Sequence, residues 1–104
     1  MNVLVIFSSC DGATEKLALA AAVGAVQARA NIRLRRLPEN FPESGDDLAR
    51  MRREYVPPTQ ADAIWAHAII VGVKGKIGDG VDNVDDATTY GRRVALSFRV
   101  RAGA

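Results

Sequence analysis

The chain begins with a sequence pattern that leaves few alternatives for its fold. Residues 2–7 form a β-branched and apolar run, and Ser8–Gly12 end that run with small and polar residues. A run of this length and boundary is typical of a strand buried on both faces, as in a parallel sheet. Residues 14–29 then predict a helix that lies close to the sheet. Its small and apolar side chains share one face, at Leu17, Ala20, Ala21, Gly24 and Ala28.

Two further strands are expected. Residues 32–37 alternate apolar and basic side chains, which favours a half-exposed edge strand. Residues 66–71 form a third strand that closes at Gly72. Strand, helix and strand in alternation indicate an α/β sandwich with right-handed parallel crossovers. The short edge strand and the buried first strand suggest the order 2-1-3.

Three more helices are expected along the chain. Residues 46–53 predict a short helix, and Thr59 caps a helical turn over residues 60–63. Residues 85–101 predict a longer helix in which Gly91 is a weak point. Its apolar stripe consists of Ala87, Tyr90, Val94 and Phe98.

Composition fits one small domain, residues 1–104, because domains usually hold about 100–200 residues. The chain is 48% hydrophobic and 25% charged with a net charge of +2, which is too mild for a nucleic-acid-binding protein. No apolar run is long enough to cross a membrane. Met1 leads into the first strand without a signal-peptide pattern, and the single cysteine excludes an internal disulfide framework. We therefore expect a cytoplasmic protein.

The topology itself places a candidate site. In such sheets ligands bind outside the carboxyl ends of strands where the winding direction reverses, here strands 1 and 3. The loops at residues 8–14 and 72–80 must meet there. The first loop offers backbone N–H groups, a helix N-terminus and two hydroxyls to an anion. Its residues are Ser9, Cys10, Asp11, Gly12, Ala13 and Thr14.

This first loop matches none of three common phosphate-binding patterns. It is neither a Walker loop nor the dinucleotide pattern with three glycines. A cysteine-phosphatase loop would have arginine where this chain has Lys16. An ordinary strand-to-helix turn, with Ser, Asp and Thr side chains as caps, remains an equal alternative.

The sequence around this loop resembles a known family. Residues 3–18 are similar to the start of flavodoxin-like proteins of the WrbA type, the NAD(P)H:quinone oxidoreductases. Residues 35–39, 55–59 and 64–72 also resemble that family, so that the likeness covers about residues 2–79. It implies a flavodoxin-like three-layer sandwich that binds FMN and reduces quinones with electrons from NAD(P)H.

The resemblance also assigns binding roles. It implies that Ser9, Gly12 and Thr14 hold the FMN phosphate, together with the backbone amides from Cys10 to Thr14. The residues placed beside the flavin ring are Val73, Lys74, Gly75, Lys76, Ile77 and Gly78. In that loop the two framing glycines match the family, whereas its proline, threonine, arginine and phenylalanine are replaced. Lys74 and Lys76 either bring positive charge to the flavin or are solvated, and Ile77 is a candidate to cover the ring.

Single reactive side chains favour structural roles. His67 has no paired histidine or carboxylate at suitable spacing, and Cys10 reads as an inert loop cysteine. No catalytic residue is assigned. The aspartates at 82, 85 and 86 fit a helix N-terminus better than a calcium loop, so no metal is expected.

The chain is shorter than the family's five-stranded domain. Residues 90–96 resemble the family's last helix, which suggests an internal deletion that joins strand 3 to this helix; fusion to an unrelated tail is the alternative. A truncated parallel sheet would leave residues 68–71 as an apolar edge without protective charges. We therefore expect a homodimer through the edge of strand 3, with one sheet continuing across a two-fold axis.

Three functions follow as alternatives. The first is an FMN-binding protein with quinone reductase chemistry, in which a second subunit would have to rebuild the wall around the flavin. The second is a non-catalytic flavodoxin-like remnant that oligomerises without binding flavin productively. The third is a small phosphate-binding regulatory module that uses only the first loop.

Overall fold

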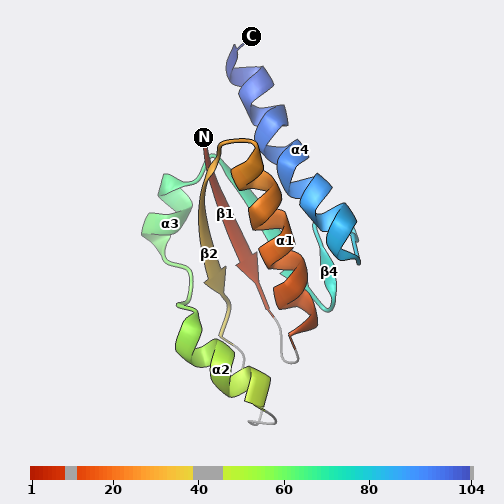
Figure 1. Ribbon diagram of the computed structural model, residues 1–104. Helices are drawn as coiled ribbons and strands as arrows, with labels where there is room; N and C mark the ends of the chain where they lie inside the picture. Colours follow the sequence, from red (N-terminus) through yellow and green to blue (C-terminus); the bar gives the residue numbers. More distant parts are fainter. Residues whose placement is uncertain (9–11, 39–45, 104) are drawn as a thin grey trace.

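The first strand is the centre of the sheet. In the computed structural model, which describes residues 1–8, 12–38 and 46–103, β1 (Asn2–Phe7) lies parallel to both neighbours (Figure 1). They are β2 (Asn31–Arg36) on one side and β3 (Ala68–Val73) on the other. The order 2-1-3 is therefore confirmed, and each predicted strand lies within two residues of its expected bounds.

Four helices connect and follow these strands in the described part of the chain. They are α1 (Ala13–Gln27), α2 (Asp46–Glu54), α3 (Gln60–Trp65) and α4 (Val84–Gly103). The predicted cap of α3 is confirmed, because the Thr59 hydroxyl accepts the N–H of Asp62 at 3.2 Å and the Asp62 carboxylate accepts the N–H of Thr59 at 3.0 Å. None of these helices combines the length and apolar character that a membrane span requires.

A fourth strand makes the sheet mixed rather than purely parallel. Residues Lys76–Ile77 form β4, which pairs antiparallel with the end of β3. Lys74 and Gly75 connect the two strands with positive φ angles of 53° and 73°, as a type I′ hairpin requires. The expectation of an entirely parallel sheet was wrong at this position, because residues 73–77 form a tight hairpin instead of an open loop.

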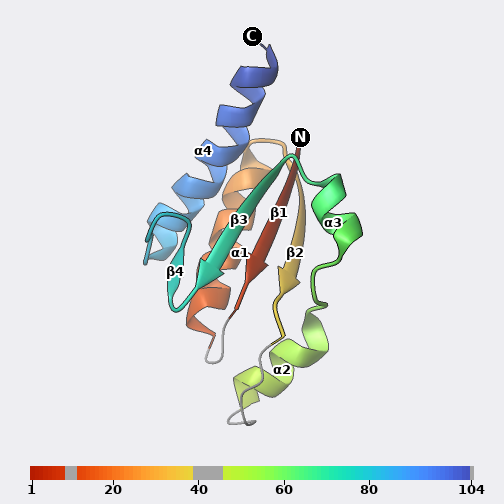
Figure 2. The same cartoon turned by 180° about the vertical axis from the view of Figure 1, so that it is seen from behind.

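The two faces of the sheet are covered unequally. Helices α1 and α4 lie side by side on one face (Figure 1), where Val3, Val5 and Phe7 pack against α1. On the other face, α3 lies beside β2, and none of the described helices lies over β3 (Figure 2). Ile69, Val71 and Val73 consequently remain 49%, 47% and 45% exposed. The predicted three-layer arrangement is present only toward β2.

Helices α1 and α4 approach each other at backbone distance. A Cβ atom on Gly24 would lie 2.8 Å from the carbonyl carbon of Thr88, and one on Gly91 would lie 2.6 Å from that of Ala21. Gly91 is therefore a close-packing position rather than the expected weak point. The small residues of α1 serve the contact with α4 as well as the sheet. Ala87 is fully buried, whereas the side chain of Phe98 lies outside those described.

Candidate functional site

The two loops that the topology predicts to meet do lie together at the carboxyl ends of β1 and β3. The N–H of Gly75 donates a hydrogen bond of 2.7 Å to the hydroxyl oxygen of Thr14. The N–H of Ser8 donates to the carbonyl oxygen of Gly72 at 2.9 Å. The tip of the β3–β4 hairpin is thus fastened to the first turn of α1.

The described part of the first loop holds the start of α1. Gly12 is the N-cap residue, with a φ of 91°, and its carbonyl oxygen accepts the N–H of Lys16 at 3.1 Å. Thr14 is only 2% exposed. The expectation that a side chain caps this helix was wrong for Thr14, which lies inside the first turn and binds the hairpin instead. Ser9, Cys10 and Asp11 lie outside the described residues.

Residues 73–78 are divided between solvent and core. Val73, Lys74 and Lys76 are exposed, whereas Ile77 is fully buried in the main apolar cluster. Gly78 lies against the ring of Tyr90, whose hydroxyl oxygen would be 2.6 Å from a Cβ atom at that position. The side chain of Ile77 therefore supports the hairpin from inside, and its place beside a flavin ring stays a prediction.

A buried charged cluster, which the sequence did not reveal, lies at the same end of α1. Glu15 is 5% exposed, and its two carboxylate oxygens accept hydrogen bonds of 2.6 and 2.9 Å from the Arg50 guanidinium. The Tyr55 hydroxyl also donates to Glu15 at 2.6 Å, and its ring packs edge-on against Phe7. The cluster therefore joins α2 and the chain after it to α1.

The protonation states of this cluster are fixed at neutral pH. The hydrogen bonds from Arg50 lower the pKa of Glu15, against an opposing effect of burial. Burial and the Glu15 carboxylate both raise the pKa of Tyr55. Glu15 is thus ionised and Tyr55 protonated at pH 7, and their hydrogen bonds hold the α2 segment against α1.

A second ionic cluster holds α3 on the β2 side of the sheet. The carboxylate of Asp62 accepts hydrogen bonds from Arg33 at 3.1 Å and from Arg35 at 3.0 Å. The bond from Arg35 and the Thr59 N–H lower the pKa of Asp62 to about 2. The Arg33 guanidinium also stacks 4.3 Å from the centre of the Trp65 ring. Arg33 and Arg35 of the alternating β2 pattern are therefore ion-paired rather than free to bind an anion.

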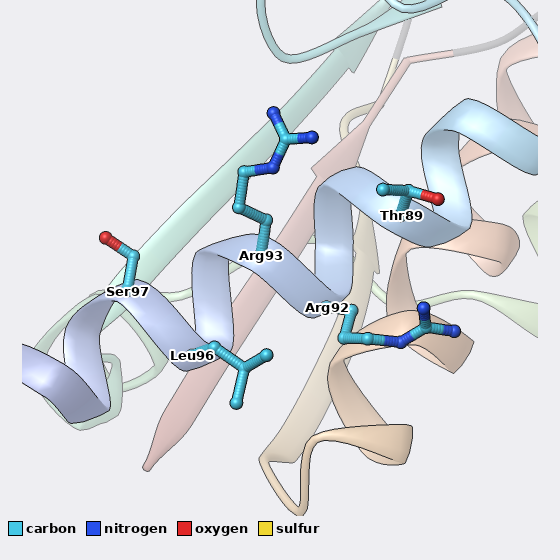
Figure 3. A pocket seen from close by; sticks show the side chains of 5 residues that line it. All are labelled: Thr89, Arg92, Arg93, Leu96 and Ser97. Carbon is cyan, nitrogen blue, oxygen red and sulfur yellow. The ribbon is translucent and has the colours of Figure 1, made fainter.

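Two cavities lie along the outer surface of α4. The larger, about 330 Å³, is lined by Thr89, Arg92, Arg93, Leu96 and Ser97, all from this one helix (Figure 3). The smaller, about 180 Å³, is lined by Val81, Asp86, Thr89, Tyr90 and Arg93. Arg92 is engaged with the side-chain oxygen of Gln27. Neither cavity includes a residue of the two predicted loops, and a groove formed by one exposed helix is too open to enclose a ligand.

Of the two reactive side chains singled out from the sequence, His67 and Cys10, only His67 lies among the described residues. Nδ1 of His67 accepts the N–H of Asn2 at 2.8 Å, which ties the start of β3 to the start of β1. Across the described residues, no three His, Cys, Asp or Glu side chains are grouped as metal ligands would be. The sequence matches no model of a known protein family.

Proposed function

We propose that the chain is a flavodoxin-like module that associates with itself and does not hold a flavin ring. The observation that carries this proposal is the hairpin at residues 73–77. The segment that would embrace the ring pairs with the end of β3 and buries Ile77 completely.

The contact between the two loops supports the same proposal. The Thr14 hydroxyl, a predicted phosphate ligand, already accepts the N–H of Gly75 at 2.7 Å. Its methyl carbon lies 3.1 Å from the Cβ position of Gly72, so the crevice is closed by direct contact at this point. A ligand that uses Thr14 as an acceptor has to displace the hairpin tip.

The self-association part of the proposal comes from the opposite face of the sheet. Ile69, Val71 and Val73 form an apolar row that is about half exposed. Burying this row against a second copy of the chain would remove apolar surface from water, which favours association.

FMN binding with quinone reduction by NAD(P)H is the second candidate. It is favoured by the meeting of the two loops at the switch point of the sheet, beside the N-terminus of α1. Ser9, Gly12 and Thr14 would hold the phosphate, and the exposed Lys74 and Lys76 would supply positive charge. Bound FMN would supply hydride transfer, and the hairpin would have to shield it from water.

Titration of flavin-free protein with FMN, followed by quenching of flavin fluorescence, tests the two candidates. We expect no quenching up to a millimolar excess of FMN from protein whose circular dichroism is that of a folded chain. Micromolar binding that weakens in both Ser9→Ala and Thr14→Ala, but not in the exposed control Thr89→Ala, would overturn the proposal in favour of the second candidate. FMN binding that inorganic phosphate displaces, together with no binding of riboflavin, would instead indicate a phosphate-binding module.

A further inference from the structure

The outward side of α4 carries opposite charges on its two halves. Asp85 and Asp86 lie in the first turn, and Arg92 and Arg93 follow about two turns later. Thr89 lies midway, because it comes three residues after Asp86 and three before Arg92. The same midpoint separates Asp85 from Arg93. All five side chains are exposed, and spacings of three and four residues place them on one side of a helix. We call these five residues the α4 charged face.

The helix dipole does not explain the position of the two arginines. The dipole favours cations in the last turn of a helix, whereas α4 continues to Gly103 and the arginines lie near the middle of its 20 residues. Arg92 is bonded to the uncharged side chain of Gln27. Among the residues that the structure describes, neither Arg92 nor Arg93 has a carboxylate within ion-pairing distance. Their positive charges are therefore not neutralised within the described part of the chain.

The two aspartates are not neutralised by the described residues either. The carboxylate of Asp86 accepts a hydrogen bond of 2.8 Å from the uncharged Asn83 amide, and neither Asp85 nor Asp86 forms an ion pair with a described residue. A helix rises about 1.5 Å per residue, so each aspartate lies about 10 Å along the axis from the arginine seven residues later. The two halves of the face are thus too far apart to pair with each other directly.

We propose that the α4 charged face pairs with the same face of a second copy of this chain, with the two α4 helices antiparallel. A two-fold axis beside Thr89 reverses the direction of the helix. It therefore places Arg92 of each copy beside Asp86 of the other. It places Arg93 of each copy beside Asp85 of the other in the same way. The small Thr89 side chains meet where the helices cross.

The order of the charges selects a second copy over other partners. A nucleic acid or an anionic membrane presents negative charge along its whole surface, so it would be repelled by the two aspartates of the face. A parallel second copy would bring like charges together, which costs free energy. A partner has to carry the reverse order of charges to neutralise both halves, and the two-fold axis supplies that order from the chain itself.

The α4 charged face is open enough to receive another helix. In Figure 1, α4 lies at the outside of the helical layer and continues past the start of the strands. Arg92 and Arg93 extend from opposite sides of the helix in Figure 3, and both line the groove of about 330 Å³. This groove is formed by one helix, so it can receive side chains of a second helix without enclosing a small molecule. The face is separate from the apolar row of β3, so the inference goes beyond the proposed self-association and does not rest on it.

Sedimentation velocity over a concentration series, at low and at high salt, tests the pairing. We expect the weight-average sedimentation coefficient of the wild type to rise with concentration at low salt. Salt screens exposed ion pairs, because the Debye length falls from about 30 Å at 0.01 M to about 3 Å at 1 M ionic strength. The dimer dissociation constant should therefore rise by about tenfold or more over this range. Association through an apolar surface would not be screened in this way.

Reversing the charges gives the sharper test. Arg92→Glu with Arg93→Glu makes the face wholly acidic, and Asp85→Lys with Asp86→Lys makes it wholly basic. Neither double variant should associate with itself, whereas an equimolar mixture of the two should form a heterodimer at low salt. A chain with all four changes carries the reversed order of charges and should dimerise again.

The matched control is Lys16→Glu with Arg53→Glu, which makes the same change in net charge at two exposed positions outside α4. This control should dimerise like the wild type, and circular dichroism checks that every variant is folded. Association that the acidic variant retains and that salt does not weaken would overturn pairing through α4 and leave the proposed association through β3 intact. A mixture of the two double variants that stays monomeric would also overturn the α4 pairing. A wild type that stays monomeric at every concentration at low salt would overturn both.

Discussion

Gly24 of α1 and Gly91 of α4 each take the place where a side chain would strike the backbone of the opposite helix. A Cβ atom on Gly24 would lie 2.9 Å from the backbone nitrogen of Arg92, and one on Gly91 would lie 2.8 Å from the Cα atom of Ala21. The two helices thus meet through their main chains, with the alanines at positions 21 and 87 fully buried. The two helices together lie on one face of the sheet.

We predict that Gly24→Ala lowers the free energy of unfolding by about 2 kcal/mol, because the added methyl group forces the helices apart. Gly91→Ala should act in the same direction. The sign is diagnostic, since alanine in an unconstrained helix would stabilise by about 1 kcal/mol relative to glycine. Urea unfolding followed by circular dichroism measures the change, with the exposed Val23→Ala as a control that should shift it little. A more stable Gly24→Ala variant would contradict the close contact.

The Glu15 cluster predicts a stability that depends on acid. The pKa of Glu15 is lowered in the folded chain, mainly by Arg50. A group with a lowered folded pKa stabilises the fold above its unfolded pKa of about 4.3, and that contribution is lost as the pH falls through the folded pKa. Glu15→Gln should therefore lower the free energy of unfolding by about 2 kcal/mol at pH 7, because it breaks a buried ion pair.

Urea titrations of the wild type and Glu15→Gln from pH 7 to pH 3 measure this effect. The two curves should converge as the pH falls. Glu54→Gln is the matched control, since Glu54 also binds Arg50 but is 53% exposed, and its effect should be small at every pH. A difference between wild type and Glu15→Gln that persists unchanged to pH 3 would show that the carboxylate charge is not what stabilises the cluster.

The bond between Thr14 and Gly75 predicts local as well as global effects. Thr14→Val keeps the shape but removes the oxygen that accepts the Gly75 N–H, which should cost about 1–2 kcal/mol of stability. Hydrogen exchange at the Gly75 amide should accelerate more than exchange in the centre of β1. Thr14→Ser retains the acceptor and should preserve the protection of Gly75. Unchanged exchange in Thr14→Val would mean that the hairpin tip is held by other contacts.

The hairpin turn predicts opposite effects for its two central residues. Gly75 has a φ of 73° with open space around it, so Gly75→Ala should lose about 1 kcal/mol through backbone strain alone. Lys74 has a φ of 53°, and Lys74→Asn should stabilise the chain because asparagine before glycine is preferred in type I′ turns. Thermal unfolding of the two variants beside wild type measures both signs. A stabilising Gly75→Ala would exclude this turn.

Much of the sheet could be predicted because its information is local. β1 lies between two neighbouring strands and is mostly buried, and its continuous apolar run predicts this directly from the sequence. β4 was missed because a strand of two residues has no alternating pattern, and its glycine-rich surroundings read as an open loop. The role of Gly91 was missed for a different reason. Gly91 is required by its contact with the backbone of Ala21, which belongs to a helix far away in the sequence. Without that contact in view, a glycine inside a helix only predicts a weak point.

The candidate site divides in the same way. The meeting of Thr14 with the second loop follows from strand order, which made it predictable. The Glu15 cluster joins residues from α1, α2 and the segment after α2, and none of these segments shows a charge pattern that points to the others. The burial of Ile77 depends on the hairpin, and the resemblance to a family with an open loop there gave no indication of it.

The small size of β4 bears on how this fold can change in evolution. β4 fills the position beside β3 with two residues, and the chain then passes Gly80, whose surroundings are open within 4 Å, before α4 begins. This turn is closed by two hydrogen bonds between Ile77 and Val81, at 2.8 and 3.0 Å, so a change of length here has to keep that pair. If the pair is kept, we expect length changes at this edge of the sheet to leave the helix pair and the central ladder as they are.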